Sequence, residues 1–470
     1  TGAAGWALFC FDETIRHKNL ILGGPRRALD TVQYCFTEAG GTEMLAPVVL
    51  ATYDGTWHAA ADRYRDWFES WCRRPKLSRL VAEMTPTRSV VVRARPVDDP
   101  ALPDIRKEME TGSYAGAIAH IREAKAQGYQ GVHLVGWHDR GHDTDFPEYL
   151  PTERMGGKEE MKRMAAFARR EGMSLCYYLN AHLCNVNSAL YHRNKHWAIR
   201  TAAGESNLES YSSEQFVVAC PMAEGFRRQI ADRVRDLVEN YAADSVQLDQ
   251  VAARPSMLCF DRTHGHATPA TAWFEGYRRM LCGVTDEMRA INPDFWIWIE
   301  GVSDAFGQFV DAQMAAGWTI HPGEETFVEL YHYTLPWQQL LWPADPFLGG
   351  VPFWCKAPAA LLAVLAPHAD LLLHGRYMDT AGLSFDAARL RAHWHRAGGD
   401  VLLVAHNRTD APVTARLELA RTVLPAGTPP GTGVSLRDGR ALVPVMREGT
   451  LQVEFPLPPG ATDGVRCRFA

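Results

Sequence analysis

The chain has 470 residues, of which 46% are hydrophobic and 22% charged, and its formal net charge is -6. This length and apolar content predict a globular protein with a large core and two or three domains. The mild charge argues against a nucleic-acid partner or an anionic membrane surface, and no run approaches the roughly 20 apolar residues of a membrane span.

The ten cysteines are scattered and form no CxxC pair. Several of them, such as Cys176, lie within apolar runs. They are therefore interpreted as buried free thiols rather than as a disulfide framework or a zinc site, which favours a reducing, cytoplasmic compartment. The chain starts at Thr1 and shows no signal-peptide pattern, so its beginning does not identify the compartment.

The first 56 residues are rich in glycine and carry short β-prone runs, which predicts the end of an N-terminal β-sandwich. Residues 57–88 are expected to form a helical connector. Its first part is an amphipathic helix in which Tyr64, Trp67 and Trp71 are spaced along one face. These aromatic side chains are interpreted as structural.

From residue 89 to residue 400, apolar strand-like runs alternate with helical patterns. The number and rhythm of these runs predict an α/β protein built on a (β/α)8 TIM barrel. From residue 401 to 470 the pattern returns to alternation with Pro/Gly turns, which predicts a small antiparallel β domain. The expected barrel strands are SVVVRA (89–94), GVHLVGW (131–137), MSLCYYLN (173–180), SVQLD (245–249), FWIWIE (295–300), GWTIH (317–321), FVELYHY (327–333) and DLLLHG (370–375).

Two acidic residues stand where apolar runs end. Asp249 ends the run that begins at residue 245, and Glu300 ends the run that begins at residue 295. In barrel enzymes, the catalytic residues lie at the carboxyl ends of the barrel strands. Either acid alone could cap a turn or pair with an arginine. Cleavage of a glycosidic bond, however, generally requires two carboxyl groups, and two strand ends here supply them.

A polar loop over residues 136–151 follows the second expected strand. It suits sugar binding, because carboxylates and imidazoles bond to hydroxyl groups and aromatic rings stack on sugars. The alternatives are a solvated loop with helix-capping acids and a metal site on His138, Asp139 and His142, although HExxH-type spacing is missing. The sugar-binding candidates in this loop are Trp137, His138, Asp139, Asp143, Asp145 and Tyr149.

Other strand ends and loops supply further candidates for substrate binding. A strand-end asparagine can donate to and accept from a sugar hydroxyl, and it can equally cap a helix. The loop CFDRTHGH (259–266) could hold a cysteine nucleophile if Cys259 were paired with a histidine, but recognition of substrate by its histidines is favoured. The candidates are Asn180, His182, Gln250, Asp261, His264, His266, His374 and Arg376.

The segments DTDFPEYLP, SVQLDQV and LCFDRTHGH, followed by Trp273, Gly276 and Tyr277, resemble a largely uncharacterised barrel family. That family is grouped with glycoside hydrolases and is similar in outline to the α-galactosidase and endo-α-N-acetylgalactosaminidase barrels. The resemblance covers roughly residues 50–400.

The resemblance implies that the acid ending strand 4, here Asp249, is the nucleophile of a retaining mechanism. It places the acid/base on strand 5 or 6, which points to Glu300. The separation between these two residues in the chain is long for the endo-acting group. The substitute acids are Asp304, Glu324, Glu325 and Glu329.

These features predict a glycoside hydrolase that cleaves an α-linked, galacto- or gluco-configured bond with retention. Asp249 would attack the anomeric carbon, and Glu300, with a raised pKa, would protonate the leaving oxygen and then activate water. The expected separation of the carboxyl groups is about 5–5.5 Å. A carbohydrate substrate is the expected partner, and no cofactor is needed. The rival hypotheses are a carbohydrate-binding barrel without catalysis and a metal-dependent hydrolase.

Overall fold

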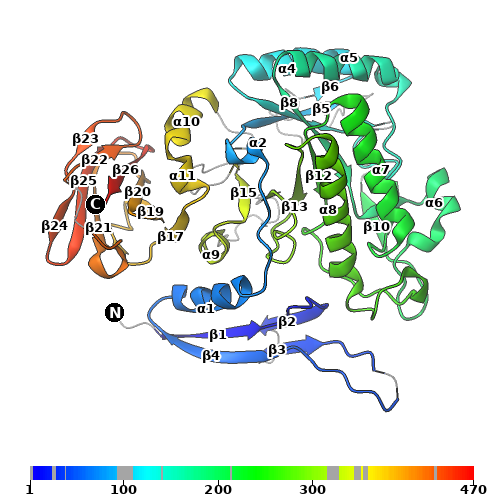
Figure 1. Ribbon diagram of the computed structural model, residues 1–470, viewed down its shortest axis with the longest axis horizontal. Helices are drawn as coiled ribbons and strands as arrows, with labels where there is room; N and C mark the ends of the chain where they lie inside the picture. The colour runs from blue at the N-terminus through cyan, green and yellow to red at the C-terminus, as the bar shows by residue number, and fades with distance from the viewer. Residues whose placement is uncertain are drawn as a thin grey trace.

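The computed structural model describes residues 4–23, 28–37, 39–92, 110–138, 141–211, 214–314, 328–342, 351–352, 358–427 and 431–469. These residues form a mixed α/β fold with a curled parallel sheet at its centre and antiparallel sheets at both ends of the chain (Figure 1). Within the described ranges, every helix is too short or too polar to cross a lipid bilayer.

The central sheet has nine strands in the order β16-β15-β14-β13-β12-β8-β7-β5-β6, and all neighbouring pairs are parallel. Strands β16 and β6, at the two edges, have two residues each, and the described residues show no pairing between them. The nine strands are β5 (Thr87–Val92), β6 (Glu110–Thr111), β7 (Gly131–Val135), β8 (Ser174–Asn180), β12 (Ser245–Asp249), β13 (Trp296–Glu300), β14 (Ala312–Met314), β15 (Gln339–Trp342) and β16 (Val351–Pro352).

Helices cover the outer face of this sheet (Figure 1). In α5, the side chains of Met161, Met164 and Phe167 are buried, while acidic residues occupy the first turn and arginines the last. This distribution buries one apolar stripe and complements the helix dipole. The helices and short elements of this part are α4 (Tyr114–Ala126), η1 (Glu153–Met155), α5 (Gly157–Arg170), α6 (Ala189–Arg193), η2 (Lys195–Trp197), α7 (Glu224–Tyr241), η3 (Arg262–His264) and α8 (Ala272–Ile291).

A three-stranded antiparallel sheet lies between β8 and α7 in the chain, in the order β10-β11-β9. Its strands are β9 (Leu183–Asn185), β10 (Leu208–Tyr211) and β11 (Glu214–Val218). Because β9 follows β8 directly, this small sheet begins at the carboxyl edge of the central sheet.

The N-terminal part consists of two antiparallel pairs, β1 with β4 and β2 with β3. Helix α1 lies against the β1–β4 pair and reaches α9, where the ring of Trp57 contacts that of Tyr333 (Figure 1). The elements are β1 (Ala4–Cys10), β2 (Lys18–Gly23), β3 (Ala28–Gln33), β4 (Val48–Asp54), α1 (His58–Glu69), α2 (Arg79–Ala82) and α9 (Val328–Thr334).

The C-terminal part contains a six-stranded sheet, β17-β19-β20-β26-β22-β23, and a four-stranded sheet, β18-β21-β25-β24. Strand β21 alternates buried and exposed side chains, as expected for a sheet with one face on a core. The elements are α10 (Pro358–Leu365), η6 (Ala366–His368), α11 (Ala369–Leu372), β17 (Arg376–Asp379), β18 (Leu383–Ser384), β19 (Leu390–Ala397), β20 (Asp400–Asn407), β21 (Val413–Ala420), η7 (Arg421–Val423), β22 (Gly433–Ser435), β23 (Ala441–Leu442), β24 (Val445–Arg447), β25 (Thr450–Leu457) and β26 (Thr462–Arg468).

Five of the expected barrel strands are confirmed as β5, β7, β8, β12 and β13. The runs at 327–333 and 370–375 were wrongly predicted as strands, because α9 and α11 occupy them. A short apolar run has no periodicity that separates a strand from a buried helix. The run at 317–321 lies outside the described residues. The C-terminal antiparallel sheets begin at Arg376, earlier than the expected boundary at 401.

Candidate active site

Asp249 and Glu300 end two neighbouring strands at the same edge of the central sheet. Strands β12 and β13 run in register from Ser245 beside Trp296 to Leu248 beside Ile299, so the next position on each strand is an acid. Side chains alternate between the two faces of a strand, which places both carboxyl groups on one face. The two side chains lie close enough for Glu300 to act on the pKa of Asp249. Counted along the sheet from β5, these are the fourth and fifth strands.

Three side chains from β8 and β12 donate hydrogen bonds to the Asp249 carboxylate. The Tyr178 hydroxyl and the Asn180 amide lie 2.7 and 3.3 Å from Oδ2. The Gln247 amide lies 3.2 Å from Oδ1. Asp249 itself is only 8% exposed. Donors on both oxygens of a buried carboxylate fix its orientation, as a group that must meet one substrate atom requires.

Burial raises the pKa of Asp249 well above its usual value, and the like charge of Glu300 raises it further. The Tyr178 hydroxyl opposes this rise, because its hydrogen bond favours the ionised form. Asp249 is the more buried of the two acids.

Asn180 connects Asp249 to a second polar chain of residues. Its amide also donates to Gln250 Oε1 at 2.9 Å, and the Gln250 amide donates to the Tyr211 hydroxyl at 2.7 Å. Gln250 has a φ of +63°, so the backbone turns immediately after Asp249 and brings residue 250 to the Asn180 side.

Glu209 on β10 lies at the far end of this chain of hydrogen bonds. It accepts one from Tyr211 at 2.6 Å and pairs with Arg254 at 3.0 Å. The fully buried His182 approaches the other Glu209 oxygen at 3.4 Å. The predicted residues Asn180, His182 and Gln250 therefore belong to one network with Asp249.

Trp137 and Tyr149 were expected to offer ring faces to a sugar, but each is only 1% exposed. The Trp137 indole donates to the Tyr178 carbonyl at 2.9 Å, and the Tyr149 hydroxyl donates to the Asn180 carbonyl at 3.0 Å. Both rings are therefore supports beneath the end of β8. They hold Tyr178 and Asn180, two of the three residues that donate to Asp249.

His138 is fully buried against the rings of Phe146 and Tyr149. Burial lowers its pKa to about 3, and His142 lowers it further. His138 is therefore neutral and cannot bond a sugar from this position.

Asp143 adds to the rise in the Asp249 pKa, and its carboxylate lies 3.6 Å from the His142 ring. Asp143 and Asp145 both have left-handed backbone conformations, with φ of +58° and +45°. The loop therefore stays beside the acid pair. Asp139 lies outside the described residues, so the alternative of a metal site on His138, Asp139 and His142 is untested.

His264 and His266 do not join the partners of Asp249. They lie with Cys220 and Cys259, and His264 Nδ1 is 3.3 Å from the Cys259 sulfur. The two thiols hydrogen-bond to each other, which lowers the pKa of Cys259 and raises that of Cys220. Asp261 caps η3 by accepting from the Thr263 N–H at 2.9 Å, so its role is local.

His374 and Arg376 were placed in the site by the strand expected at 370–375. That segment is helical, and His374 is exposed while Arg376 begins β17. The Arg376 guanidinium pairs with Asp62 of α1 at 3.2 Å. Both residues are therefore removed from the candidate site.

The described substitute acids are bound elsewhere. Asp304 accepts a short hydrogen bond from Tyr64, and Glu329 pairs with Arg391 of β19. Glu324 and Glu325 lie outside the described residues.

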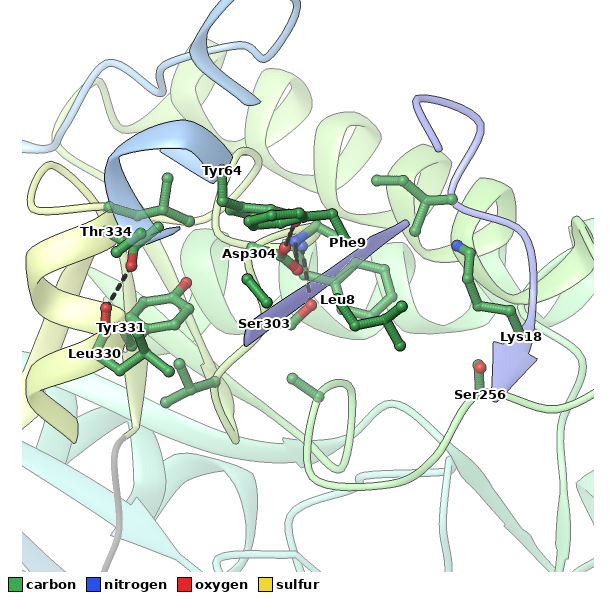
Figure 2. Close-up of a pocket in the computed structure, with 18 of the residues that line it drawn as sticks. Leu8, Phe9, Lys18, Tyr64, Ser256, Ser303, Asp304, Leu330, Tyr331 and Thr334 are labelled. Carbon is green, nitrogen blue, oxygen red and sulfur yellow. Dashed lines mark hydrogen bonds between the residues drawn. The ribbon is translucent and has the colours of Figure 1, made fainter. Parts of the chain in front are cut away.

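A pocket of about 820 Å³ lies between the N-terminal strands and the loops that leave β12 and β13 (Figure 2). Leu8 and Phe9 of β1 and Tyr64 of α1 line it together with Ser256 and Asp304 of these loops, and Tyr64 lies beside Asp304 (Figure 2). Asp249 and Glu300 are not among its lining residues. The pocket is therefore a neighbour of the acid pair and does not contain it.

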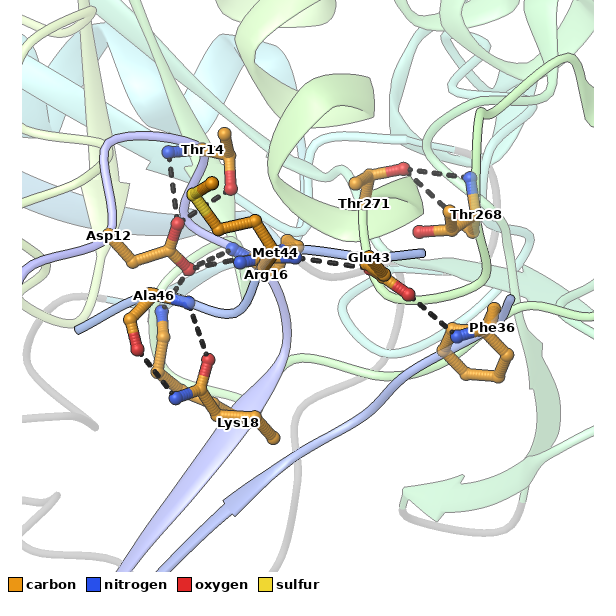
Figure 3. Close-up of polar contacts among 11 residues, drawn as sticks. Asp12, Thr14, Arg16, Lys18, Phe36, Glu43, Met44, Ala46, Thr268 and Thr271 are labelled. Carbon is orange, nitrogen blue, oxygen red and sulfur yellow. Dashed lines mark hydrogen bonds and ion pairs between the residues drawn. The ribbon is translucent and has the colours of Figure 1, made fainter. Parts of the chain in front are cut away.

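The turn between β1 and β2 closes part of this pocket and is held by ion pairs (Figure 3). Asp12 accepts from the Thr14 hydroxyl at 2.6 Å and pairs with Lys18 at 2.8 Å. Arg16 reaches Glu43 at 3.1 Å. These contacts fix the N-terminal wall of the pocket.

Sequence reasoning missed Tyr178, Gln247, Tyr211, Glu209 and Cys220. Tyr178 and Gln247 each precede a recognised strand-end residue by two positions, so the period of a strand could have revealed them. The other three lie on segments that only the fold brings close.

A family described as "Domain of unknown function (DUF6259)" matches residues 44–334. A protein of Bacteroides thetaiotaomicron named "Putative glycoside hydrolase" is 28% identical over 236 residues, which are 49% of this chain and 32% of that protein. This chain thus spans about a third of the relative's length.

Two solved structures share the fold. The ligand-free α-N-acetylgalactosaminidase NagBb of Bifidobacterium bifidum has a TM-score of 0.63 at 16% identity, over 86% of this chain and 71% of that one. The noncanonic maltogenic α-amylase AmyB of Thermotoga neapolitana has a TM-score of 0.54 at 11% identity, over 83% of this chain and 99% of that one. Identities this low establish likeness of fold alone.

Proposed function

Because the chain belongs to the DUF6259 family, whose description leaves the function open, we propose from its own site that it is a retaining glycoside hydrolase. The observation that carries the proposal is the contact between Asp249 and Glu300 at the carboxyl ends of neighbouring parallel strands. The names of the Bacteroides thetaiotaomicron relative and of the two structural neighbours support the same class of reaction. A (β/α)8 barrel that closes beyond the described strands is part of this proposal.

In the first step, an Asp249 oxygen forms a bond to the anomeric carbon while the bond from that carbon to the leaving oxygen breaks. Glu300 gives its proton to the leaving oxygen. In the second step, Glu300 takes a proton from water, and the water oxygen displaces Asp249 from the anomeric carbon. The acid pair therefore ends with the one proton with which it began.

The hydrogen bonds that Asp249 accepts suit this cycle. The first step needs an ionised nucleophile and a protonated acid, which together carry one proton. Tyr178, Asn180 and Gln247 all direct donors at Asp249, so they favour the ionised form on that residue once a sugar separates the two carboxyl groups.

Retention is favoured over inversion by the contact between the acids. An inverting enzyme holds a water molecule beneath the sugar and separates its carboxyl groups by roughly 6.5–9.5 Å, whereas retaining enzymes keep them about 5–5.5 Å apart. Acids that follow the same register position on neighbouring parallel strands, close enough for one to shift the pKa of the other, favour the short side of this division. An α-linked, galacto- or gluco-configured substrate is proposed from the names of the structural neighbours.

An activity screen on α- and β-linked aryl glycosides tests the proposal. We expect the wild-type protein to release the aryl group from an α-glycoside, and Asp249→Asn and Glu300→Gln to lose this activity. Asp304→Asn is the matched control, because its carboxylate binds Tyr64 in the neighbouring pocket. Equal activity of Asp249→Asn and wild type would refute the assignment.

A further inference from the structure

Two cysteines and two histidines from distant parts of the chain converge on one buried point. One ligand atom from each of Cys220, Cys259, His264 and His266 lies within 4.8 Å of all the others. Both cysteines are fully buried and His264 is 7% exposed. Cys220 follows β11, whereas the other three residues belong to the long loop between β12 and α8.

The two ring nitrogens of His264 make different contacts. Nδ1 lies 3.3 Å from the Cys259 sulfur, and Nε2 bonds to the backbone carbonyl of His196. A carbonyl can only accept, so Nε2 carries the hydrogen and Nδ1 presents its lone pair to the cysteines. Histidines that bind metals are commonly fixed in this way, by a hydrogen bond from the second ring nitrogen to a carbonyl.

His266 has a different environment. Both of its ring nitrogens are shielded from solvent and make no hydrogen bond of ordinary geometry with the described residues, and one of them lies within 4.8 Å of the Cys259 sulfur. A buried imidazole without a partner loses its bonds to water and gains nothing in return. A cation held between His266 and the two sulfurs would remove that cost.

We propose that Cys220, Cys259, His264 and His266 bind a structural zinc ion. Two thiolates and two imidazoles are a closed, four-ligand set of the kind that holds zinc in tetrahedral geometry. Zinc bonds of about 2.0–2.3 Å place tetrahedral ligand atoms roughly 3.3–3.8 Å apart. The present spread of up to 4.8 Å needs side-chain movements of only about 1 Å, so the existing backbone can hold the ion.

The site would secure the loop that leaves the acid-bearing strand β12. In this loop, the Cys259 N–H bonds to the Pro269 carbonyl at 3.3 Å and the Phe260 N–H to the Arg200 carbonyl at 2.8 Å. Zinc would add a crosslink between the loop and the segment that ends at Cys220. With four protein ligands it has no open position for substrate. This proposal does not depend on the glycosidase proposal.

Metal analysis of the full chain, purified without chelator, tests the site. We expect one zinc ion per chain in the wild type and at least a tenfold lower content in Cys220→Ser. Cys282→Ser is the matched control, because Cys282 is a partly buried thiol on α8 outside the cluster. Its zinc content should equal that of the wild type.

Two further measurements keep the test decisive if Cys220→Ser fails to fold. Removal of zinc from the wild type by a chelator should lower the thermal midpoint, and added zinc should restore it. Cobalt in place of zinc should give thiolate-to-cobalt charge-transfer absorption. Zinc-free protein that takes up neither metal, or a mass showing a Cys220–Cys259 disulfide, would overturn the proposal, as would equal zinc loss in Cys282→Ser.

Discussion

Replacing Tyr178 with phenylalanine tests how Asp249 is held ready for attack. The change removes one hydroxyl, which donates a 2.7 Å hydrogen bond to Asp249 Oδ2 in a buried site. A hydrogen bond to a charged group contributes about 1.5–3 kcal/mol. Because this bond favours the ionised carboxylate, its loss makes Asp249 harder to ionise.

The expected effect on catalysis follows from that energy. At about 1.4 kcal/mol per pH unit, the acid limb of the pH profile of kcat/KM should move upward by roughly 1–2 units. On the acid side of the profile this means a loss of about 10- to 100-fold, whereas the loss should be smaller at higher pH. The assay is the pH dependence of aryl glycoside hydrolysis by Tyr178→Phe and wild type.

Tyr177→Phe is the matched control. Its hydroxyl is equally buried, but it donates at 2.8 Å to the Tyr241 carbonyl on the opposite face of β8. This variant should lose a similar amount of stability and keep the wild-type pH profile. If the acid limb is unmoved in Tyr178→Phe, or moves equally in both variants, then Tyr178 does not act through Asp249.

Three other predictions concern the acid pair and its sheet. Folding raises the pKa of Asp249, so its stabilising contribution is present below the unfolded pKa and is lost as pH rises through the folded pKa. In urea titrations, Asp249→Asn should therefore gain stability relative to wild type as pH rises above about 4, and a constant difference would contradict this. Glu300→Gln should lower kcat/KM by about 10²–10⁴-fold for substrates with poor leaving groups. The loss of kcat/KM should be smaller for activated aryl glycosides, and added azide should restore activity. An equal loss of kcat/KM for all leaving groups would exclude an acid/base role. Asp311→Ala should lower the free energy of unfolding by about 3 kcal/mol, because Arg289 and two backbone N–H groups lose their acceptor. Asp294→Ala is the control and should lose under about 1 kcal/mol, because the Asp294 side chain is partly exposed and pairs with Arg79 at 3.1 Å. Equal losses of stability in the two variants would refute the structural role given to Asp311.

The acid pair was accessible from sequence because its signal is local. Strand β13 is an uninterrupted apolar run, WIWI, whereas β12 alternates polar and apolar residues, SVQL, and each of these two buried strands ends on an acid. The register of these two strands was not encoded in either run, yet it is what brings Asp249 and Glu300 into contact.

The sequence predicted His264 and His266 in the Asp249 pocket from their position in the chain alone. Their loop starts at the strand that carries Asp249, and nearness in the chain suggested nearness in space. The loop instead carries His264 and His266 to Cys220, which lies in another segment. No short-range spacing pattern could have shown that convergence.

Trp137 and Tyr149 were predicted to form a sugar platform, but both rings are buried. Trp137 and Tyr149 follow β7, as a sugar platform would. Their hydrogen bonds to the backbone of β8 draw both rings into the core. Exposure depends on how the loop folds, and the sequence pattern holds no information on that.

Trapping the glycosyl-enzyme tests the central claim most directly. A 5-fluoro glycosyl fluoride of the preferred configuration slows the second step, so the covalent intermediate should accumulate and survive digestion for peptide mass spectrometry. We predict one added fluorosugar per chain, attached to Asp249. A label on any other residue, or turnover to a product of inverted anomeric configuration with no covalent adduct, would contradict the mechanism.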